Sequence, residues 1–168
     1  MKTAVLALAL ASIMPAMAFD IPGAGKLKES AGAAAADKAL EGMTKQLKEI
    51  QNDKGPIVFK TGKAVIDVEK CKTTLETAAS IINNFPGSSL VVRVEGYTDS
   101  KGSVQANKRI SQQRAQAVVN WLKSTGKVDA KLLTAKGFGP ENPIADNTTE
   151  EGRAKNRRVD FTVMRAAK

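Results

Sequence analysis

The stretch LVVRVEGYTDSKG, residues 90–102, decides the fold that we expect. Leu90, Val92 and Val94 occupy every second position, and a period of two residues is typical of a β-strand that buries one face. The strand then runs into Thr98 and Asp99, so polar side chains stand directly at its end. We therefore expect a core strand that carries a polar cluster at its carboxyl end.

Two amphipathic helices flank this strand. The upstream helix follows Asp67, which suits an N-cap, and stops at the sequence FPG of residues 85–87. The downstream helix is expected over about residues 104–124, with Gly126 beyond its end. Both repeat apolar residues at helical spacing. The first apolar face comprises Val68, Cys71, Leu75, Ala78 or Ala79, and Ile82; the second comprises Ile110, Ala117, Val118, Trp121 and Leu122.

Three further strands are expected at residues 57–59, 132–138 and 159–163. The stretch 139–156 is polar and rich in turn residues, so we expect a long loop with a helical turn near Glu150. The resulting order, β-α-β-α-β-loop-β, predicts an α/β fold of the α+β sandwich type. Its two helices would pack on one face of a small mixed sheet.

The N-terminus has the features of a secretory signal peptide over residues 1–18. Lys2 supplies a positive charge, residues 4–13 an apolar run, and PAMA at 15–18 a small-residue cleavage site. The apolar run is shorter than the roughly 20 residues that cross a bilayer. We expect export, a mature chain from Phe19 and no transmembrane span in that chain.

Residues 19–54 precede a single expected domain at residues 55–168 and are rich in Ala, Lys and Glu. The early part of this segment holds several glycines, which leaves partial disorder open as an alternative to helix. Spacings of three and four residues then predict an amphipathic helix. Its stripe consists of Ala36, Leu40, Met43, Leu47 and Ile50. Packing on the domain, a partner protein bound through residues 36–50, and self-association into a dimer all fit this stripe.

The composition limits which ligands and cofactors we expect. The formal charge of +9, or +8 without Lys2, favours acidic partners, and the expected export excludes nucleic acid. The chain has no histidine and one cysteine, so no metal site or cofactor is expected. Cys71 can form no intramolecular disulfide, and we expect it on a buried helix face, with intermolecular pairing as the alternative.

Four segments in order resemble the OmpA-like peptidoglycan-binding domain family across residues 55–165. They are VEGYTDSKGS at 94–103, NKRISQQRA at 107–115, GFG at 137–139 and NRRV at 156–159, with PIA at 143–145 in the intervening loop. The resemblance implies a non-catalytic domain that binds peptidoglycan without a covalent bond. It also implies a ligand, the diaminopimelate of the stem peptide.

The free end of diaminopimelate carries an ammonium and a carboxylate. The resemblance assigns the principal contacts to Asp99 and Arg114, and a carboxylate and a planar guanidinium suit those two charges. Thr98 and Asn107 are implied to shape the pocket, and helical spacing places Asn107 on one face with Arg114. Arg157 and Arg158 match a basic pair near the site, and the sequence leaves open which one faces the ligand.

Other interpretations of these residues exist. Asp99 could cap a turn, Arg114 could pair with Glu95 or stay solvated, and the arginine pair could end a charged loop. The chain also departs from the family pattern. Tyr97 stands where histidine is frequent, and Lys60 stands where an acidic or amide residue is frequent, which adds a cation that would repel an ammonium.

We therefore expect a periplasmic protein of a Gram-negative envelope, associated with the outer membrane and cell wall, that tethers or stabilises the envelope. Residues 19–54 are too few for an N-terminal outer-membrane barrel. The alternative is a periplasmic adaptor or self-associating protein that works through its N-terminal helix. A muramidase would need two carboxylates, one of them in an apolar setting, and Asp99, Glu95, Glu141 and Glu150 all lack that setting.

Overall fold

The computed structural model describes residues 24–84, 90–125 and 128–166; the expected signal peptide lies outside them. Three strands form one sheet in the order β2-β1-β3. They are β1 (Leu90–Tyr97), β2 (Leu133–Gly139) and β3 (Val159–Arg165). β1 is the central strand, parallel to β2 and antiparallel to β3, which confirms the expected mixed sheet.

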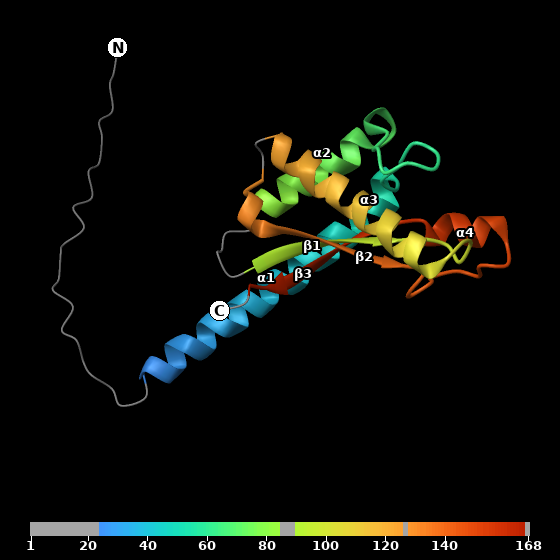
Figure 1. Cartoon of the computed structure of the whole chain (residues 1–168). Helices are drawn as coiled ribbons and strands as arrows, with labels where there is room; N and C mark the ends of the chain where they lie inside the picture. The colour runs from blue at the N-terminus through green and yellow to red at the C-terminus, as the bar shows by residue number, and fades with distance from the viewer. Residues whose placement is uncertain (1–23, 85–89, 126–127, 167–168) are drawn as a thin grey trace, which may run out of the picture.

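Two helices, α2 (Val68–Asn84) and α3 (Val104–Ser124), lie together on one face of the sheet (Figure 1). This confirms the predicted α+β architecture. Val92 and Val94 of β1 point toward these helices and are buried. The approach of α3 to the sheet is so close that a Cβ at Gly137 would lie 2.3 Å from the backbone nitrogen of Gln112. Only glycine fits this position, because β2 and α3 meet there backbone to backbone.

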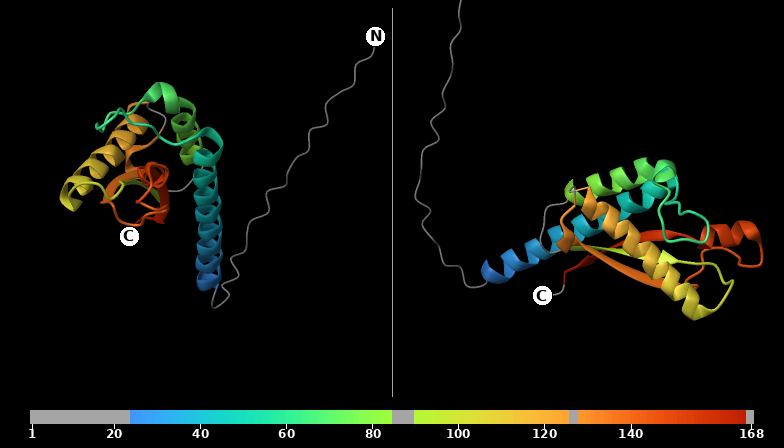
Figure 2. Two further views of the ribbon diagram at one scale, coloured as in Figure 1. Left: turned by 90° about the vertical axis from the view of Figure 1, so that its right-hand side faces the viewer. Right: turned by 45° about the horizontal axis from the view of Figure 1, so that its top comes forward.

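The N-terminal helix α1 (Ala24–Lys54) packs against α2 and along the outer edge of β3 (Figure 2). Met43, Leu47 and Ile50 are at most 4 % exposed and belong to the same core as the sheet, with Leu40 packed beside them. Two side-chain hydrogen bonds fix the helix. Gln51 Nε2 donates to the Val159 carbonyl at 2.7 Å, and Thr74 Oγ1 donates to the Lys54 carbonyl at 3.1 Å. Within the described residues, the apolar stripe is therefore buried by this chain's own domain.

The expected strand at residues 57–59 does not form. Phe59 makes an isolated antiparallel bridge with Ile66, and Lys60 N donates to the Val65 carbonyl at 2.9 Å around a turn at Gly62. The segment closes on itself because α1 already covers the neighbouring edge of β3. Cys71 lies in the core at a kink of α2, in the buried position expected for it.

A short helix, α4 (Glu150–Asn156), replaces the single helical turn expected near Glu150. Thr149 accepts a hydrogen bond from Gly152 N at 3.0 Å, and two glutamates occupy the first turn, which suits the positive end of a helix. A 3₁₀ turn, η1 (Ala130–Leu132), leads into β2. α4 ends at Asn156, directly before Arg157 and Arg158, and so fixes the position of these two arginines in space.

Candidate ligand-binding site

Asp99 follows the end of β1 and is 8 % exposed. Its Oδ1 accepts a hydrogen bond from the backbone nitrogen of Lys101 at 3.0 Å, so it caps its own turn. Its Oδ2 accepts from Arg157 Nη1 at 2.8 Å. The two interpretations of Asp99 are thus compatible, because one oxygen holds the turn while the other takes part in a charged pair.

Thr98 and Asn107 hold the loop that carries Asp99. Thr98 N donates to the Gly139 carbonyl at 2.8 Å, and Thr98 Oγ1 donates to the carbonyl of Asp99 at 2.9 Å. Asn107 Nδ2 donates to the Lys101 carbonyl at 2.9 Å from the first turns of α3. Both side chains are engaged with the backbone, so they set the position of the Asp99 carboxylate.

Arg114 projects from α3 toward the segment at residues 56–62. Its guanidinium lies 5.3 Å from the centre of the Phe59 ring, and its Nε donates to the Lys63 carbonyl at 3.4 Å. Burial lowers the pKa of Arg114, and the positive charge of Arg157 lowers it further, while Asp99 acts in the opposite direction. Arg114 therefore shares one electrostatic environment with Asp99 and Arg157, and forms no ion pair with a described carboxylate.

The two adjacent arginines diverge. Arg157 pairs with Asp99 and with Glu150, whose Oε1 lies 3.0 Å from Arg157 Nη2. Arg158 turns to the helix-free face of the sheet. Its guanidinium lies 3.9 Å from the centre of the Tyr97 ring, and its Nε lies 2.8 Å from Asp160 Oδ2. Within the described residues, Arg157 is the member of the pair that lies at Asp99.

Asp99, Arg114 and Arg157 thus form a cluster with one carboxylate and two guanidinium groups. The hydrogen bond from Arg157 to Asp99, followed by smaller effects of Glu150, raises the pKa of Arg157, so this guanidinium stays charged. Arg114 retains capacity for a carboxylate, whereas Asp99 is occupied by Arg157. A ligand ammonium can reach Asp99 only by sharing or replacing that contact.

Sequence reasoning gave no role to two residues that support this cluster. Asn156 is fully buried; its Oδ1 accepts from Ile144 N at 2.8 Å, and its Nδ2 donates to the Ala145 carbonyl at 2.8 Å. Glu150 holds Arg157 from the first turn of α4. The position of Asn156 directly before the arginine pair could have indicated a role. Its hydrogen-bond partners, Ile144 and Ala145, lie in a loop whose path the sequence does not specify.

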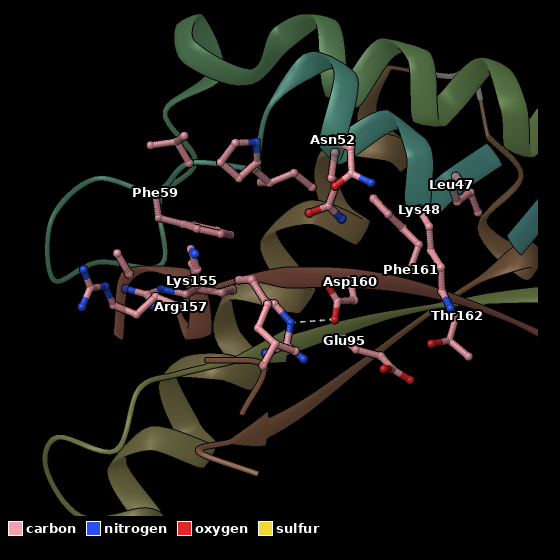
Figure 3. Close-up of a pocket in the computed structure, with 18 of the residues that line it drawn as sticks. Leu47, Lys48, Asn52, Phe59, Glu95, Lys155, Arg157, Asp160, Phe161 and Thr162 are labelled. Carbon is pink, nitrogen blue, oxygen red and sulfur yellow. Dashed lines mark hydrogen bonds and ion pairs between the residues drawn. The ribbon is translucent and has the colours of Figure 1, made fainter. Parts of the chain in front are cut away.

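The two departures from the family pattern have different positions. Tyr97 stacks on Phe138, with ring centres 5.3 Å apart, and donates its hydroxyl hydrogen to Glu95 Oε2 at 2.7 Å. Burial, together with this contact to Glu95, raises the pKa of Tyr97. Lys60 is exposed and lines the same groove as Arg114 and Arg157. The groove separates the segment of residues 56–62 from α4 and β3 (Figure 3).

The sequence model described as the OmpA family matches residues 58–157. The chain belongs to the OmpA family. It is 47% identical over 90 residues to the probable lipoprotein YiaD of Escherichia coli, which covers 54% of this chain and 40% of YiaD. It is 47% identical over 72 residues to the peptidoglycan-binding protein ArfA of Mycobacterium tuberculosis, covering 43% of this chain and 22% of ArfA. The chain thus spans less than half the length of either relative.

The fold is also similar to the crystal structure of the peptidoglycan-associated lipoprotein from Burkholderia pseudomallei. The TM-score is 0.57 at 26% identity, covering 64% of this chain and 88% of that protein. Among the described residues, no helix combines the length and apolarity that crossing a membrane requires. In the same residues, no three Asp, Glu, Cys or His side chains are grouped closely enough to hold a metal ion.

Proposed function

We propose that this OmpA-family chain binds peptidoglycan non-covalently, without catalysis, through the zwitterionic end of diaminopimelate. The observation that carries the proposal is the cluster of Asp99, Arg114 and Arg157, which offers one anion and two cations; both cations line a groove. ArfA is named as a peptidoglycan-binding protein and the Burkholderia lipoprotein as peptidoglycan-associated, which supports the same ligand for this chain.

The ligand carboxylate would accept hydrogen bonds from the guanidinium of Arg114, whose two parallel donors match the two carboxylate oxygens. The ligand ammonium would take Asp99 Oδ2 and compete there with Arg157. Arg157 would keep its second contact to Glu150 and stay beside the ligand carboxylate as a further cation. Because Asp99 is 8 % exposed and Arg114 is partly buried, these contacts are stronger than equivalent pairs between fully exposed side chains.

A chain of this kind would tether or stabilise the envelope from the periplasm, in association with the cell wall and the outer membrane. The alternative, an adaptor that captures a protein partner through residues 36–50, needs an accessible apolar stripe. Met43, Leu47 and Ile50 are buried against the chain's own domain and Leu40 is partly buried, which argues against that alternative.

The test is co-sedimentation of the mature protein with purified, protein-free peptidoglycan sacculi at moderate salt. Asp99→Asn preserves the acceptor for Lys101 N while it removes the negative charge, and Arg114→Ala removes the carboxylate partner. Both variants should stay in the supernatant, and the wild type should sediment.

Two matched variants control for net charge. Arg109→Ala removes an exposed cation from the same helix as Arg114, and Asp53→Ala removes an exposed carboxylate at the end of α1. Both should sediment like the wild type. If Arg109→Ala is lost from the pellet as completely as Arg114→Ala, attraction by net charge explains the binding and the proposed pocket is wrong.

A further inference from the structure

The groove at Arg114 and Arg157 extends well beyond the cluster. Its volume is about 1360 Å³, and it continues between β3 and the last turns of α1, past Lys48 and Thr162 (Figure 3). Pockets that enclose a whole small molecule measure roughly 300–1,000 Å³. One end of a diaminopimelate residue would therefore fill only a fraction of this groove.

The groove is also long enough to hold a short extended peptide. Arg158, directly before β3, and Thr162 within β3 both line it and are four residues apart. At about 3.4 Å per strand residue, this part of the wall spans about 14 Å. An extended peptide of about four residues covers the same distance.

The charge of the lining is predominantly positive, with six lysine or arginine side chains and three carboxylates. Two of these carboxylates are already paired: Asp160 with Arg158, and Glu95 with Arg93 from outside the groove. Lys48 of α1, Lys60 of the segment at residues 56–62, and Lys155 of α4 are exposed and form no ion pair with described residues. Three separate ammonium groups suit a ligand with several separate carboxylates.

We infer that the groove binds the rest of the stem peptide as an extended chain. Its two free carboxylates outside the diaminopimelate end pair with Lys48 and Lys155, and Lys60 adds a third positive charge to the groove. Helix α1 is then one wall of the ligand site, and Lys48 and Lys155 are further binding residues. This inference rests on the proposed function, because Arg114 and Arg157 line both the cluster and the groove.

The test uses calorimetric titration of the mature protein with three probes. They are free diaminopimelate, a synthetic stem tetrapeptide that contains it, and the same tetrapeptide with every carboxylate outside the diaminopimelate end amidated. The wild type should bind the free-acid tetrapeptide about 2- to 30-fold more tightly than the amidated one, because each exposed pair contributes a factor of about 1.4 to 5. In the variant Lys48→Ala/Lys155→Ala, the ratio of the two affinities should fall toward one.

The control variant Lys38→Ala/Lys123→Ala removes two exposed lysines outside the groove and should keep the wild-type ratio. A ratio of one in the wild type, or a wild-type ratio in Lys48→Ala/Lys155→Ala, overturns the inference alone. An equal fall in both double variants overturns it as well, since net charge would then be the cause. If free diaminopimelate and both peptides fail to bind, the proposed function itself is wrong.

Discussion

Arg157 and Arg158 show how neighbouring residues acquire different tasks at the point where α4 ends and β3 begins. Arg157 is the C-cap of α4 and lies at the centre of a tight turn, in which Arg158 N donates to the Asn156 carbonyl at 3.0 Å. The chain reverses direction there, and one arginine turns to Asp99 and the other to Tyr97. The sequence identified the pair but could not separate its members. The partner of Arg157 lies 58 residues away, and no local pattern reports such a contact.

The pair permits a prediction that separates binding from stability. Arg158→Ala should lower the free energy of unfolding by about 1–3 kcal/mol, because it removes the contact with the Tyr97 ring and leaves Asp160 unpaired. Arg157→Ala should cost about 1 kcal/mol, since its own side chain is 38% exposed and Asp99 keeps the hydrogen bond from Lys101 N, but should weaken sedimentation with sacculi. Urea unfolding and co-sedimentation of both variants test this; the reverse order in either measurement would contradict it.

Glu95 gives a prediction for pH. Burial alone would raise its pKa, but hydrogen bonds from Tyr97 and Arg93 outweigh burial, so the pKa of Glu95 lies below its usual value. A carboxyl whose pKa is lowered by folding stabilises the protein above its unfolded pKa, and this contribution disappears as pH falls through the folded pKa. The stability advantage of the wild type over Glu95→Gln should therefore shrink between about pH 6 and about pH 3.

Urea unfolding of the two proteins across this range measures that difference. Comparison with the variant matters because Asp160, which pairs with Glu95 in register across β1 and β3, has its pKa raised by burial and responds to acid with the opposite sign. A constant gap between the wild type and Glu95→Gln over the whole range would mean that Glu95 has the same pKa in the folded and unfolded states.

At the scale of elements, α1 covers the exposed edge of the sheet at β3. β3 is an edge strand, and an uncovered edge offers backbone groups to other chains. Gln51 donates to the Val159 carbonyl, and Leu47 covers the strand from the side. The period of the apolar stripe predicted the helix, but it could not predict which surface buries that stripe, since amphipathicity specifies only that some apolar surface does.

Replacement of a single stripe residue tests this packing. Leu47 is 1% exposed, so Leu47→Ala should lower the free energy of unfolding by about 2–5 kcal/mol through lost burial and a residual cavity. Lys45→Ala, on the exposed side of the same helix, should change it by less than about 0.5 kcal/mol. Urea unfolding with matched slopes gives both values. Equal, small effects would show that α1 leaves the domain in solution and that its stripe is available to a partner.

Element prediction succeeded where periodicity is long and failed where it is short. The helices at 68–84 and 104–124 carry five or six turns of pattern, and the strands at 90–97 and 159–165 alternate clearly. At residues 57–59 the only signal was a run of three apolar residues. The chain turns back at Gly62, so Phe59 forms only an isolated bridge with Ile66. α4 was missed in its full length because its stability comes from the Thr149 cap and the buried Asn156 rather than from an apolar face.

At the scale of the whole molecule, the formal charge of +9 creates a second route to an anionic wall polymer. This attraction acts over distances comparable to the Debye length, which falls from about 10 Å at 0.1 M salt to about 3 Å at 1 M. Contacts to a buried carboxylate such as Asp99 and to the partly buried Arg114 are screened less. Salt therefore separates the specific site from the general charge of the molecule.

We predict that raising salt from about 0.1 M to about 0.5 M weakens sedimentation of the wild type with sacculi but does not abolish it. Arg114→Ala should lose its residual sedimentation over the same range, because only the screened attraction remains to it. Arg109→Ala carries the same charge as Arg114→Ala and should follow the wild type. If all three proteins leave the pellet together, the net charge holds the chain on the wall; if they diverge as expected, the difference measures the contribution of the cluster of Asp99, Arg114 and Arg157.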